Sequence, residues 1–590
     1  MKTLKYISLV ALTALLASCN FLNQEPYDEF TDAEFWKTED QARTFMYGFY
    51  TSVFSGYGTG VAHGPFLMGQ GLNDDFASGT KQSNLQPEVI PESDGAWSFA
   101  NIRKANYVLE NIDRMDATAM AKNHWRGVAR FFRACYYSNL TFTFGDVPWY
   151  DHVPLSNDEK DLYRDRDPRV FVDSCIMADF RYAMDSVRES DGNLQVNKYV
   201  VAGMASRMML REGTYLKYHY ADTDPAAADM AEKCLVFAKE AALMVMNGGK
   251  YHIAPSYNAL FTSDDLAGNP EVLMYRHYVD GVLMHSTLAY SYTESQVGAS
   301  KSLAEAFLCS DGKPVYVKEA FWTPRTAEQF FANRDPRLSM CIRMSADKKY
   351  LVKGTKCEPF QYALSGFSWR KFMDDTKAGT ENPNFKSEKN VTDAPCLRYA
   401  EVLLNYVEAA YELHDLKPSY EFTQADIDKS INLIRDRAGV EMPHLEMSGT
   451  QPAVGGMTYD DPKRLEIESQ ANGKVTSPLL WEIRRERRIE LCFEGFRLND
   501  LKRWGKLDYI WNGCNPDIRF GAYIVATDYQ GKAAEVVFED PSYTEGYILL
   551  NTENQRDRPI ERNYISPVPN GQILLYQAHG YTLTQTKEWQ

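Results

Sequence analysis

Residues 481–505 read WEIRRERRIELCFEGFRLNDLKRWG, with five arginines between Arg484 and Arg497. A short basic run often contacts phosphate, so this stretch raises the question of nucleic-acid binding. Glutamates are interleaved with the arginines, and Ile489, Phe493 and Phe496 form an apolar seam if the segment is helical. The stretch holds seven Lys or Arg against five Asp or Glu. This pattern predicts a packed structural helix whose arginines find carboxylate partners inside the fold.

The charge of the whole chain argues in the same direction. The 590 residues carry a formal net charge of -16, and the isoelectric point is about 5.3. Such a chain repels a polyanion, so nucleic acid is not an expected partner. Aromatic residues make up 13% of the chain, with 37 Tyr and 10 Trp. This surplus favours a ligand-binding role for some of the rings.

The first residues, MKTLKYISLVALTALLASC, predict an exported lipoprotein. Two lysines precede an apolar run that is too short to span a membrane, and small residues follow it, as in a signal peptide. The box Leu16-Ala17-Ser18 before Cys19 resembles a bacterial lipobox, in which the cysteine is acylated. We therefore expect residues 1–18 to be a signal peptide and Cys19 to be a lipid anchor. The alternative is an ordinary signal peptide that happens to contain a cysteine.

Apolar residues at intervals of three and four predict a mostly α-helical chain. Thr38 and Gln41 form a capping box before one such helix, and further helices are expected around residues 128–139, 201–208, 231–245, 399–410 and 427–438. Small and aromatic residues on neighbouring helices are similar to those of tetratricopeptide pairs, without a strict period. Residues 250–400 lose the helical period and are rich in loop-forming residues, with a possible strand at 271–276. No linker separates folded blocks, which favours one compact unit made of regions 19–250 and 251–590.

The chain resembles the SusD/RagB family of outer-membrane lipoproteins. The resemblance rests on blocks that keep their order along nearly the whole mature chain: 481–505 above all, and also 19–22, 35–36, 102–112, 129–134, 144–148, 334–338, 397–406, 431–439 and 564–569. One departure is the tail at 577–581, which lacks the asparagine-proline pair usual in the family. The matching blocks are structural and identify the role of the protein, whereas the ligand residues vary across the family.

This resemblance implies a fold, a location and a partner. The fold is mostly helical, with tetratricopeptide-like pairs as a scaffold and a loop-rich ligand-binding region with few short strands. The protein is expected in the outer membrane, anchored through acylated Cys19 and facing the cell surface. Its expected partner is a SusC-like, TonB-dependent transporter, to which it delivers a captured nutrient, most often an oligosaccharide.

Sugar binding needs aromatic faces for the C–H patches of the rings and short polar side chains for the hydroxyl groups. Two stretches combine these residue types. The candidate ligand-binding residues are Asp74, Asp75 and Trp97 in the first stretch, and Tyr290, Tyr292 and Trp322 in the second. Each has a structural alternative: Trp97 can anchor the helix at 102, the two tyrosines can pack on one strand face, and the aspartates can solvate a turn.

No constellation for catalysis, metal or cofactor stands out. The chain lacks the HExxH, GxSxG and GxxxxGK[ST] motifs. The cysteines include no CxxC pair, and an acidic pair alone is poor evidence for calcium. We therefore expect a protein that binds an oligosaccharide and is not an enzyme. Two alternatives stay open: a RagB-like peptide-binding lipoprotein, and a secreted glycan hydrolase.

Overall fold

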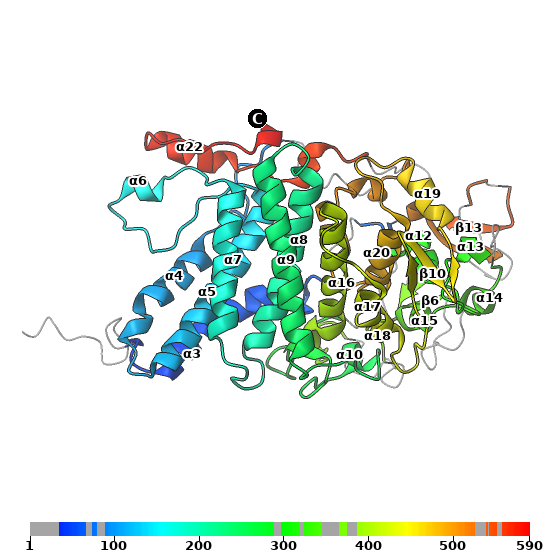
Figure 1. Ribbon diagram of the computed structural model, residues 1–590, viewed down its shortest axis with the longest axis horizontal. Helices are drawn as coiled ribbons and strands as arrows, with labels where there is room; N and C mark the ends of the chain where they lie inside the picture. The colour runs from blue at the N-terminus through cyan, green and yellow to red at the C-terminus, as the bar shows by residue number, and fades with distance from the viewer. Residues whose placement is uncertain are drawn as a thin grey trace, which may run out of the picture.

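The computed structural model describes residues 35–66, 73–78, 89–287, 289, 297–318, 324–344, 365–374, 386–525, 538–540, 542–550 and 557–590. Figure 1 shows long helices side by side in one half of the molecule, and shorter helices and the strands in the other half. The expected fold class, mostly helical with few short strands, is confirmed. The predicted signal peptide and Cys19 lie outside the described residues.

Long antiparallel helices build the first half. They are α3 (Glu39–Val53), α4 (Ala100–Asn111), α5 (Ala119–Phe144), α7 (Arg169–Ser186), α8 (Lys198–His219) and α9 (Pro225–Asn247). Side-chain caps begin four of them: Thr38 and Gln41 make the predicted capping box of α3, Thr118 caps α5, Asn197 caps α8, and Asp224 caps α9 ahead of Pro225. The closest pairs are α5 with α7 and α8 with α9.

One short helix, α6 (Glu159–Leu162), lies among the long ones in the sequence, and mostly shorter helices follow residue 250. These are α10 (Ala259–Thr262), α12 (Lys301–Ala306), α13 (Val315–Lys318), α14 (Ala327–Phe331), α15 (Pro336–Cys341), α16 (Tyr399–Leu416), α17 (Gln424–Asp428), α18 (Ile431–Arg435), α19 (Pro462–Glu468), α20 (Pro478–Glu490), α21 (Arg497–Arg503) and α22 (Asn570–Ala578). The longest of them, α16, packs against α8, α9 and α20. It therefore joins the helical half to the C-terminal half.

The strands are short and pair only in antiparallel fashion in the described part of the chain. They are β1 (Gly58–Thr59), β2 (Ala62–His63), β3 (Phe76–Ser78), β4 (Val272–Arg276), β5 (Val297–Ala299), β6 (Ile342–Met344), β7 (Phe367–Trp369), β8 (Ala394–Arg398), β9 (Glu446–Ser448), β10 (Gln451–Val454), β11 (Met457–Thr458), β12 (Phe520–Val525) and β13 (Glu545–Leu549). The possible strand at 271–276 is found as β4, which pairs with β8.

Two large clusters of buried apolar side chains form the core. One lies among the long helices and includes residues from Trp36 to Leu491. The other lies among the strands and short helices and includes residues from Tyr57 to Ile548. Because the two ranges overlap along the sequence, the chain contributes to both clusters repeatedly. This interleaving explains why no linker separates the two halves.

Two expected helices differ from the structure. The helix expected at 427–438 is two short helices, α17 and α18, because Ser430 leaves helical geometry (φ -136°, ψ -89°) and its hydroxyl donates to the carbonyls of Asp426 and Ile427. The arginine helix α20 ends at Glu490, where a single helix with a seam through Phe493 was expected. Phe493 and Gly495 both have positive φ, of 64° and 87°, which a continuing helix does not allow.

None of the described helices is both long and apolar enough to cross a membrane. The division into regions 19–250 and 251–590 stays a prediction.

The turn at Gly495 is expected to be sensitive to substitution. A Cβ at this position would lie 2.5 Å from the Pro65 carbonyl oxygen, in a backbone conformation that disfavours other residues. We expect Gly495→Ala to lower the free energy of unfolding by about 2 kcal/mol or more, measured by denaturant titration. Gly95→Ala is the control, because a Cβ there meets no atom within 4 Å. Equal stability of the two variants would contradict this account of the turn.

Candidate functional site

The arginine run lies inside the molecule. The side chains of Arg484, Arg485, Arg487, Arg488 and Arg497 are 10% exposed or less. Each forms an ion pair with a carboxylate at 3.2 Å or closer. The predicted packed structural helix with internal ion pairs is confirmed, with the earlier helix end given above. A run that is buried and paired in this way does not present a basic surface to the phosphate backbone of a nucleic acid.

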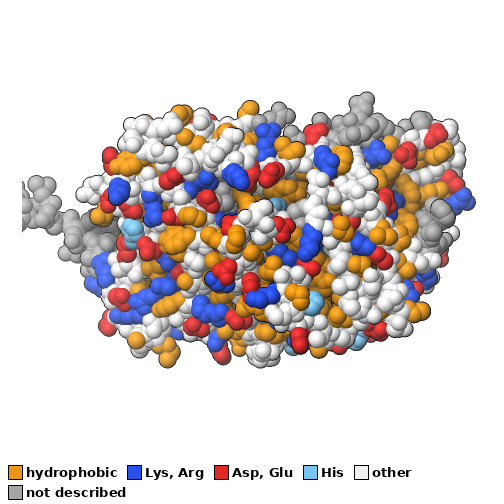
Figure 2. Space-filling model, turned by 45° about the horizontal axis from the view of Figure 1, so that its top comes forward, with side chains coloured by type: hydrophobic (Ala, Val, Ile, Leu, Met, Phe, Trp, Pro, Cys, Tyr) orange, Lys and Arg blue, Asp and Glu red, His pale blue; other side chains and the backbone are white. Residues whose placement is uncertain are grey.

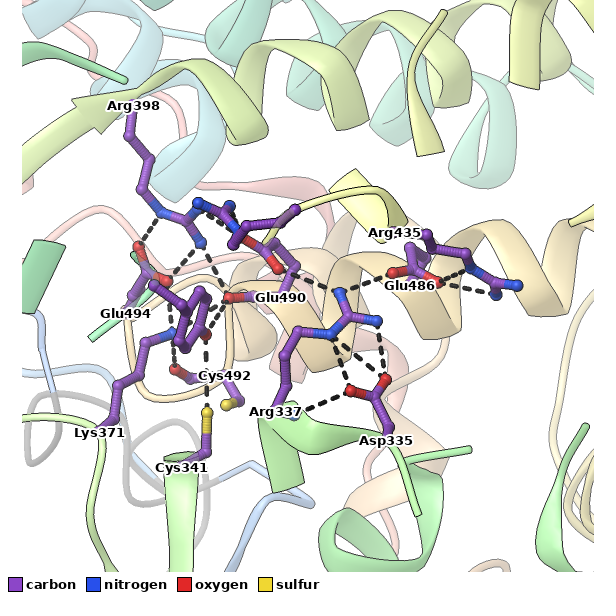
Figure 3. Close-up of polar contacts among 12 residues, drawn as sticks. Asp335, Arg337, Cys341, Lys371, Arg398, Arg435, Glu486, Glu490, Cys492 and Glu494 are labelled. Atoms are coloured by element: carbon purple, nitrogen blue, oxygen red, sulfur yellow. Dashed lines mark hydrogen bonds and ion pairs between the residues drawn. The ribbon is translucent and has the colours of Figure 1, made fainter. Parts of the chain in front are cut away.

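Glu490, the last residue of α20, is the centre of a buried ion network (Figure 3). Its carboxylate accepts hydrogen bonds from Arg337 at 3.0 Å, Arg398 at 2.7 Å and Arg437 at 2.9 Å. All four side chains are at most 1% exposed. Burial alone raises the pKa of a carboxyl group, but the three arginines outweigh it and hold the pKa of Glu490 well below its usual range. The three arginines come from distant parts of the chain, so this residue joins them.

The network continues into the turn after α20. Glu494 accepts from Lys371 at 2.6 Å and from Arg398 at 2.7 Å, and Lys371 also donates to the carbonyl oxygens of Glu490 and Cys492 (Figure 3). These contacts hold β8 and the segment around residue 371 against the turn. This turn positions the start of α21.

Asp74 and Asp75 bind arginines of the same run. Asp74 accepts hydrogen bonds from Nε and Nη2 of Arg497 at 2.7 and 2.8 Å, and Asp75 accepts one from Nε of Arg488 at 2.7 Å. Both aspartates are only 1% exposed. Although burial opposes it, Arg488 and Arg497 lower the pKa of Asp74 to about 2. The position of these carboxylates gives them a structural role and lends no support to the expected contact with a ligand.

Pairing of β3 with β5 joins the segment that carries Asp74 and Asp75 to residues 297–300. Phe76 is opposite Ala299 and Ser78 is opposite Val297, and the Ser300 hydroxyl donates to the Asp74 carbonyl at 2.6 Å. Tyr290, Tyr292 and Trp322 themselves lie outside the described residues, so their expected ligand contacts stay predictions.

Trp97 lies in a different neighbourhood. Its ring packs edge to face on Phe99 at 5.6 Å and on Phe144 at 5.0 Å between ring centroids. It also packs against a small cluster that includes Val568 and Tyr576 of the C-terminal segment. The half-buried ring thus anchors the start of α4, which is the structural alternative given above for Trp97. It shares none of these neighbours with Asp74 or Asp75.

Aromatic side chains that the sequence did not single out gather on the β12–β13 pair. Tyr523 is the register partner of Tyr547, and their ring centroids lie 5.2 Å apart, edge to face. Phe520 lies 6.4 Å from Tyr547, and all three rings are partly exposed. Figure 1 shows β13 at the end of the molecule that carries the strands and short helices, beside α13. We name Phe520, Tyr523 and Tyr547 the aromatic face.

Charged and hydroxyl groups adjoin the aromatic face. Glu305 accepts from the hydroxyls of Tyr316 at 2.6 Å and Tyr547 at 3.3 Å, and Lys301 lies 4.6 Å from the centroid of the Tyr547 ring. Lys301 also donates to Asp517 at 2.7 Å. Burial opposes its charge, but the carboxylates of Glu305 and Asp517 raise the pKa of Lys301 well above its usual range. The lysine is therefore a fixed cation beside the rings.

This arrangement suits binding better than chemistry. Rings with polar groups at their edges are the combination that sugar recognition needs. Within the described ranges, no group of three or more His, Cys, Asp or Glu is placed to hold a metal ion.

The sequence signal for the aromatic face was weak. Only the alternation in FGAYIV at 520–525 marks a strand, and the partner of this strand, β13, begins 20 residues further along the chain.

The fold and its buried arginine network can be compared with known proteins. A model of the SusD family matches residues 270–589, which is more than half of the chain. The chain belongs to the SusD family. The matched region includes α20, the network around Glu490 and the aromatic face, so the features described above lie within the part of this SusD protein that defines its family.

Relatives agree with this assignment along most of the chain. SusD-like protein P2 from Formosa agariphila is 23% identical over 537 residues, which cover 88% of this chain and 94% of that protein. A SusD-like carbohydrate-binding protein from Bacteroides fragilis has 20% identity and a TM-score of 0.65, covering 91% of this chain and 98% of its own. A structure solved with a xylogluco-oligosaccharide has 17% identity and a TM-score of 0.53, covering 85% and 91%. At these identities the solved structures show a shared fold.

The face of the molecule drawn in Figure 2 has mixed charge. Lys and Arg side chains on it alternate with Asp and Glu, and apolar side chains lie between them. The arginine run contributes little to any surface because it is buried.

The network around Glu490 predicts a large loss of stability when one partner is removed. Arg398→Met removes the cation that pairs with all three of Glu271, Glu490 and Glu494, and we expect a loss of about 3–5 kcal/mol in the free energy of unfolding. Denaturant titration measures it. Lys233→Met, in an exposed pair with Asp229, is the control and should leave stability nearly unchanged. A small effect of Arg398→Met would show that the network does not hold the fold.

The same network predicts a pH dependence. Glu486, Glu490 and Glu494 all have lowered pKa values, because their arginine and lysine partners outweigh burial. A carboxyl group whose pKa is lowered by folding stabilises the fold above its unfolded pKa, here 4.5, and loses this contribution as pH falls below it. We therefore expect the denaturant concentration at the midpoint of unfolding to decrease as the pH is lowered below 4.5. In Glu494→Gln this decrease should be less steep. Identical slopes in the two proteins would contradict the role of Glu494.

Proposed function

We propose that this SusD protein is a lipid-anchored outer-membrane protein that captures an oligosaccharide and delivers it, uncleaved, to a SusC-like TonB-dependent transporter. The observation that carries the proposal is membership of the SusD family together with a partly exposed aromatic face at the loop-rich end. The relatives' descriptions as carbohydrate-binding, and the structure with a xylogluco-oligosaccharide, support a glycan as ligand.

The aromatic face is our proposed contact surface. Tyr523 and Tyr547 are partly exposed and offer ring surface for sugar C–H groups, and the buried pair Lys301 and Glu305 holds the Tyr547 ring and hydroxyl in place. The predicted ligand residues Tyr290, Tyr292 and Trp322 stay part of the proposal, since their segments adjoin β5 and α13 in sequence. We no longer propose Asp74 and Asp75, because arginines occupy their carboxylates.

The anchor and the transporter rest on the sequence and the family. Cys19 follows a lipobox-like segment, and acylation there attaches the protein to the membrane without a spanning helix. A single acyl chain binds membranes only marginally, so stable attachment requires more than one. The transporter follows from the family role and has no further support in the described contacts.

Peptide capture by a RagB-like protein is the second candidate function. Extended peptides bind mainly through backbone hydrogen bonds, often along an exposed strand edge. The aromatic face favours a glycan over a peptide, because rings with polar edges suit sugar hydroxyls. Hydrolysis of a glycan is the least favoured candidate.

Replacing one ring of the aromatic face should weaken glycan binding. We expect Tyr523→Ala to reduce affinity for a retained oligosaccharide about tenfold, which corresponds to loss of one stacking contact of about 1.4 kcal/mol. A glycan array identifies the ligand, and calorimetry measures the affinity. Tyr47→Ala, which removes an exposed tyrosine from α3, is the matched control. Unchanged glycan binding in Tyr523→Ala, or retention of peptides only, would contradict the proposed ligand surface.

Acylation of Cys19 has its own test. Mass spectrometry of the mature N-terminus should find Cys19 as the first residue with more than one acyl chain. Cys19→Ser should move the protein from the membrane fraction to the soluble fraction. A mature chain that keeps residues before Cys19, or that carries no lipid, would contradict the anchor.

A further inference from the structure

A second possible binding site lies in the middle of the molecule, away from the aromatic face. It is a pocket of about 210 Å³ between the end of α3, the middle of α8, the β8–α16 junction and the α20–α21 turn. Ser52 and Asn139 at its rim are exposed, so the pocket opens to solvent. None of the residues predicted from the sequence to contact a ligand lines it.

The pocket carries an excess of positive charge. Five arginines line it, against three carboxylates: Arg207, Arg211, Arg398, Arg487 and Arg503 against Glu401, Glu494 and Asp500. This excess of arginines in the lining is opposite in sign to the net charge of the whole chain, which is -16. A cationic pocket in an acidic protein attracts a small anion locally.

Two of these arginines keep a nitrogen without a partner in the described part of the chain. Arg207 binds Glu401 through Nε and Nη2, at 2.6 Å each, which leaves Nη1. Arg487 binds Asp500 through Nε and Asn405 through Nη1, both at 2.8 Å, which leaves Nη2. Arg211 donates to Asn139 and Ser138, and its Nε lies 3.7 Å from Glu212. Guanidinium donors of this kind suit a carboxylate.

The surroundings of Arg211 also favour an anion. Burial, together with repulsion from Arg169 and Arg207, lowers the pKa of Arg211 to about 10, although Glu212 opposes this. Arg398 and Arg503, by contrast, are held by Glu490, Glu494 and Glu408 behind the pocket wall, so Arg207 and Arg487 are the arginines that can bind a carboxylate in it.

The size and walls of the pocket limit the ligand. A cavity of about 150 Å³ holds one benzene ring. The pocket, at about 210 Å³, therefore has room for one six-membered ring with substituents and not for a chain. Met208 and Leu397 provide apolar wall, and Ser52, Asn139 and Asn499 provide hydroxyl and amide groups that suit sugar hydroxyls.

We propose that this pocket binds one ring-sized unit that carries a carboxylate, such as a hexuronic acid residue of an acidic glycan. The arginines that line the pocket favour a ligand with a carboxylate, and the volume of the pocket limits this ligand to one ring. The choice of a sugar rests on the proposed function. The ligand of the aromatic face needs no charge, so the two sites are separable by experiment.

Calorimetry with D-glucuronate and with methyl glucoside, its neutral counterpart, tests the proposal on the purified protein. We expect binding of glucuronate only, weakened at about 0.5 M salt because the attraction is partly electrostatic. Arg207→Lys keeps the ion pair with Glu401 but removes the unpaired Nη1, and should weaken binding about tenfold or more. Ser52→Trp keeps every charge and fills the mouth, and should abolish binding.

Arg181→Lys is the matched control, because Arg181 lies exposed on α7, where it pairs with Glu240 and does not line the pocket. It should leave glucuronate binding unchanged. Absence of glucuronate binding, equal binding of both sugars, or unchanged binding in Ser52→Trp would overturn the proposal. Tyr523→Ala, measured in parallel with a neutral oligosaccharide, reports on the aromatic face alone, so failure of one site is distinguishable from failure of the other.

Discussion

The ion pairing of Glu490 is the constraint on which the rest of the structure depends. A carboxylate with no exposed surface is costly unless charged donors surround it, and here three arginines from separate segments do so. Each arginine also binds a further carboxylate, Asp335, Glu271 or Glu494, so removing one charge leaves several others unpaired. The network therefore specifies where α15, β8, α18 and α20 meet, beyond what apolar packing alone would fix.

The network around Glu490 is connected both to the long helices and to the strands. The long helices form a rigid layer against α16, whose other neighbour is α20, so the network is tied to the helical half. On its other side, Arg488 and Arg497 hold Asp74 and Asp75 and with them the β3–β5 pair. The loop-rich end that carries the aromatic face is thus supported by buried charge. Binding groups on loops need such rigid support to keep their geometry.

Much of the fold could be predicted from the sequence, because helical periodicity and capping are local signals. Thr38 and Gln41 marked α3 correctly, and the mixed charge of 481–505 correctly indicated a buried helix. Its end at Glu490 could not be predicted, because it depends on positive φ at Phe493 and on the contact of Gly495 with Pro65, which is distant in sequence. The ion pairs of Asp74 and Asp75 could not be predicted for the same reason: their arginine partners are more than 400 residues away. The aromatic face likewise depends on strand pairing.

The central claim is that this SusD protein captures an intact glycan on the aromatic face. The most direct measurement is a crystal structure of the protein with the oligosaccharide that a glycan array selects. We predict an uncleaved glycan whose rings stack on Tyr523 and Tyr547. A glycan bound elsewhere with the aromatic face empty, or a shortened glycan, would contradict the account.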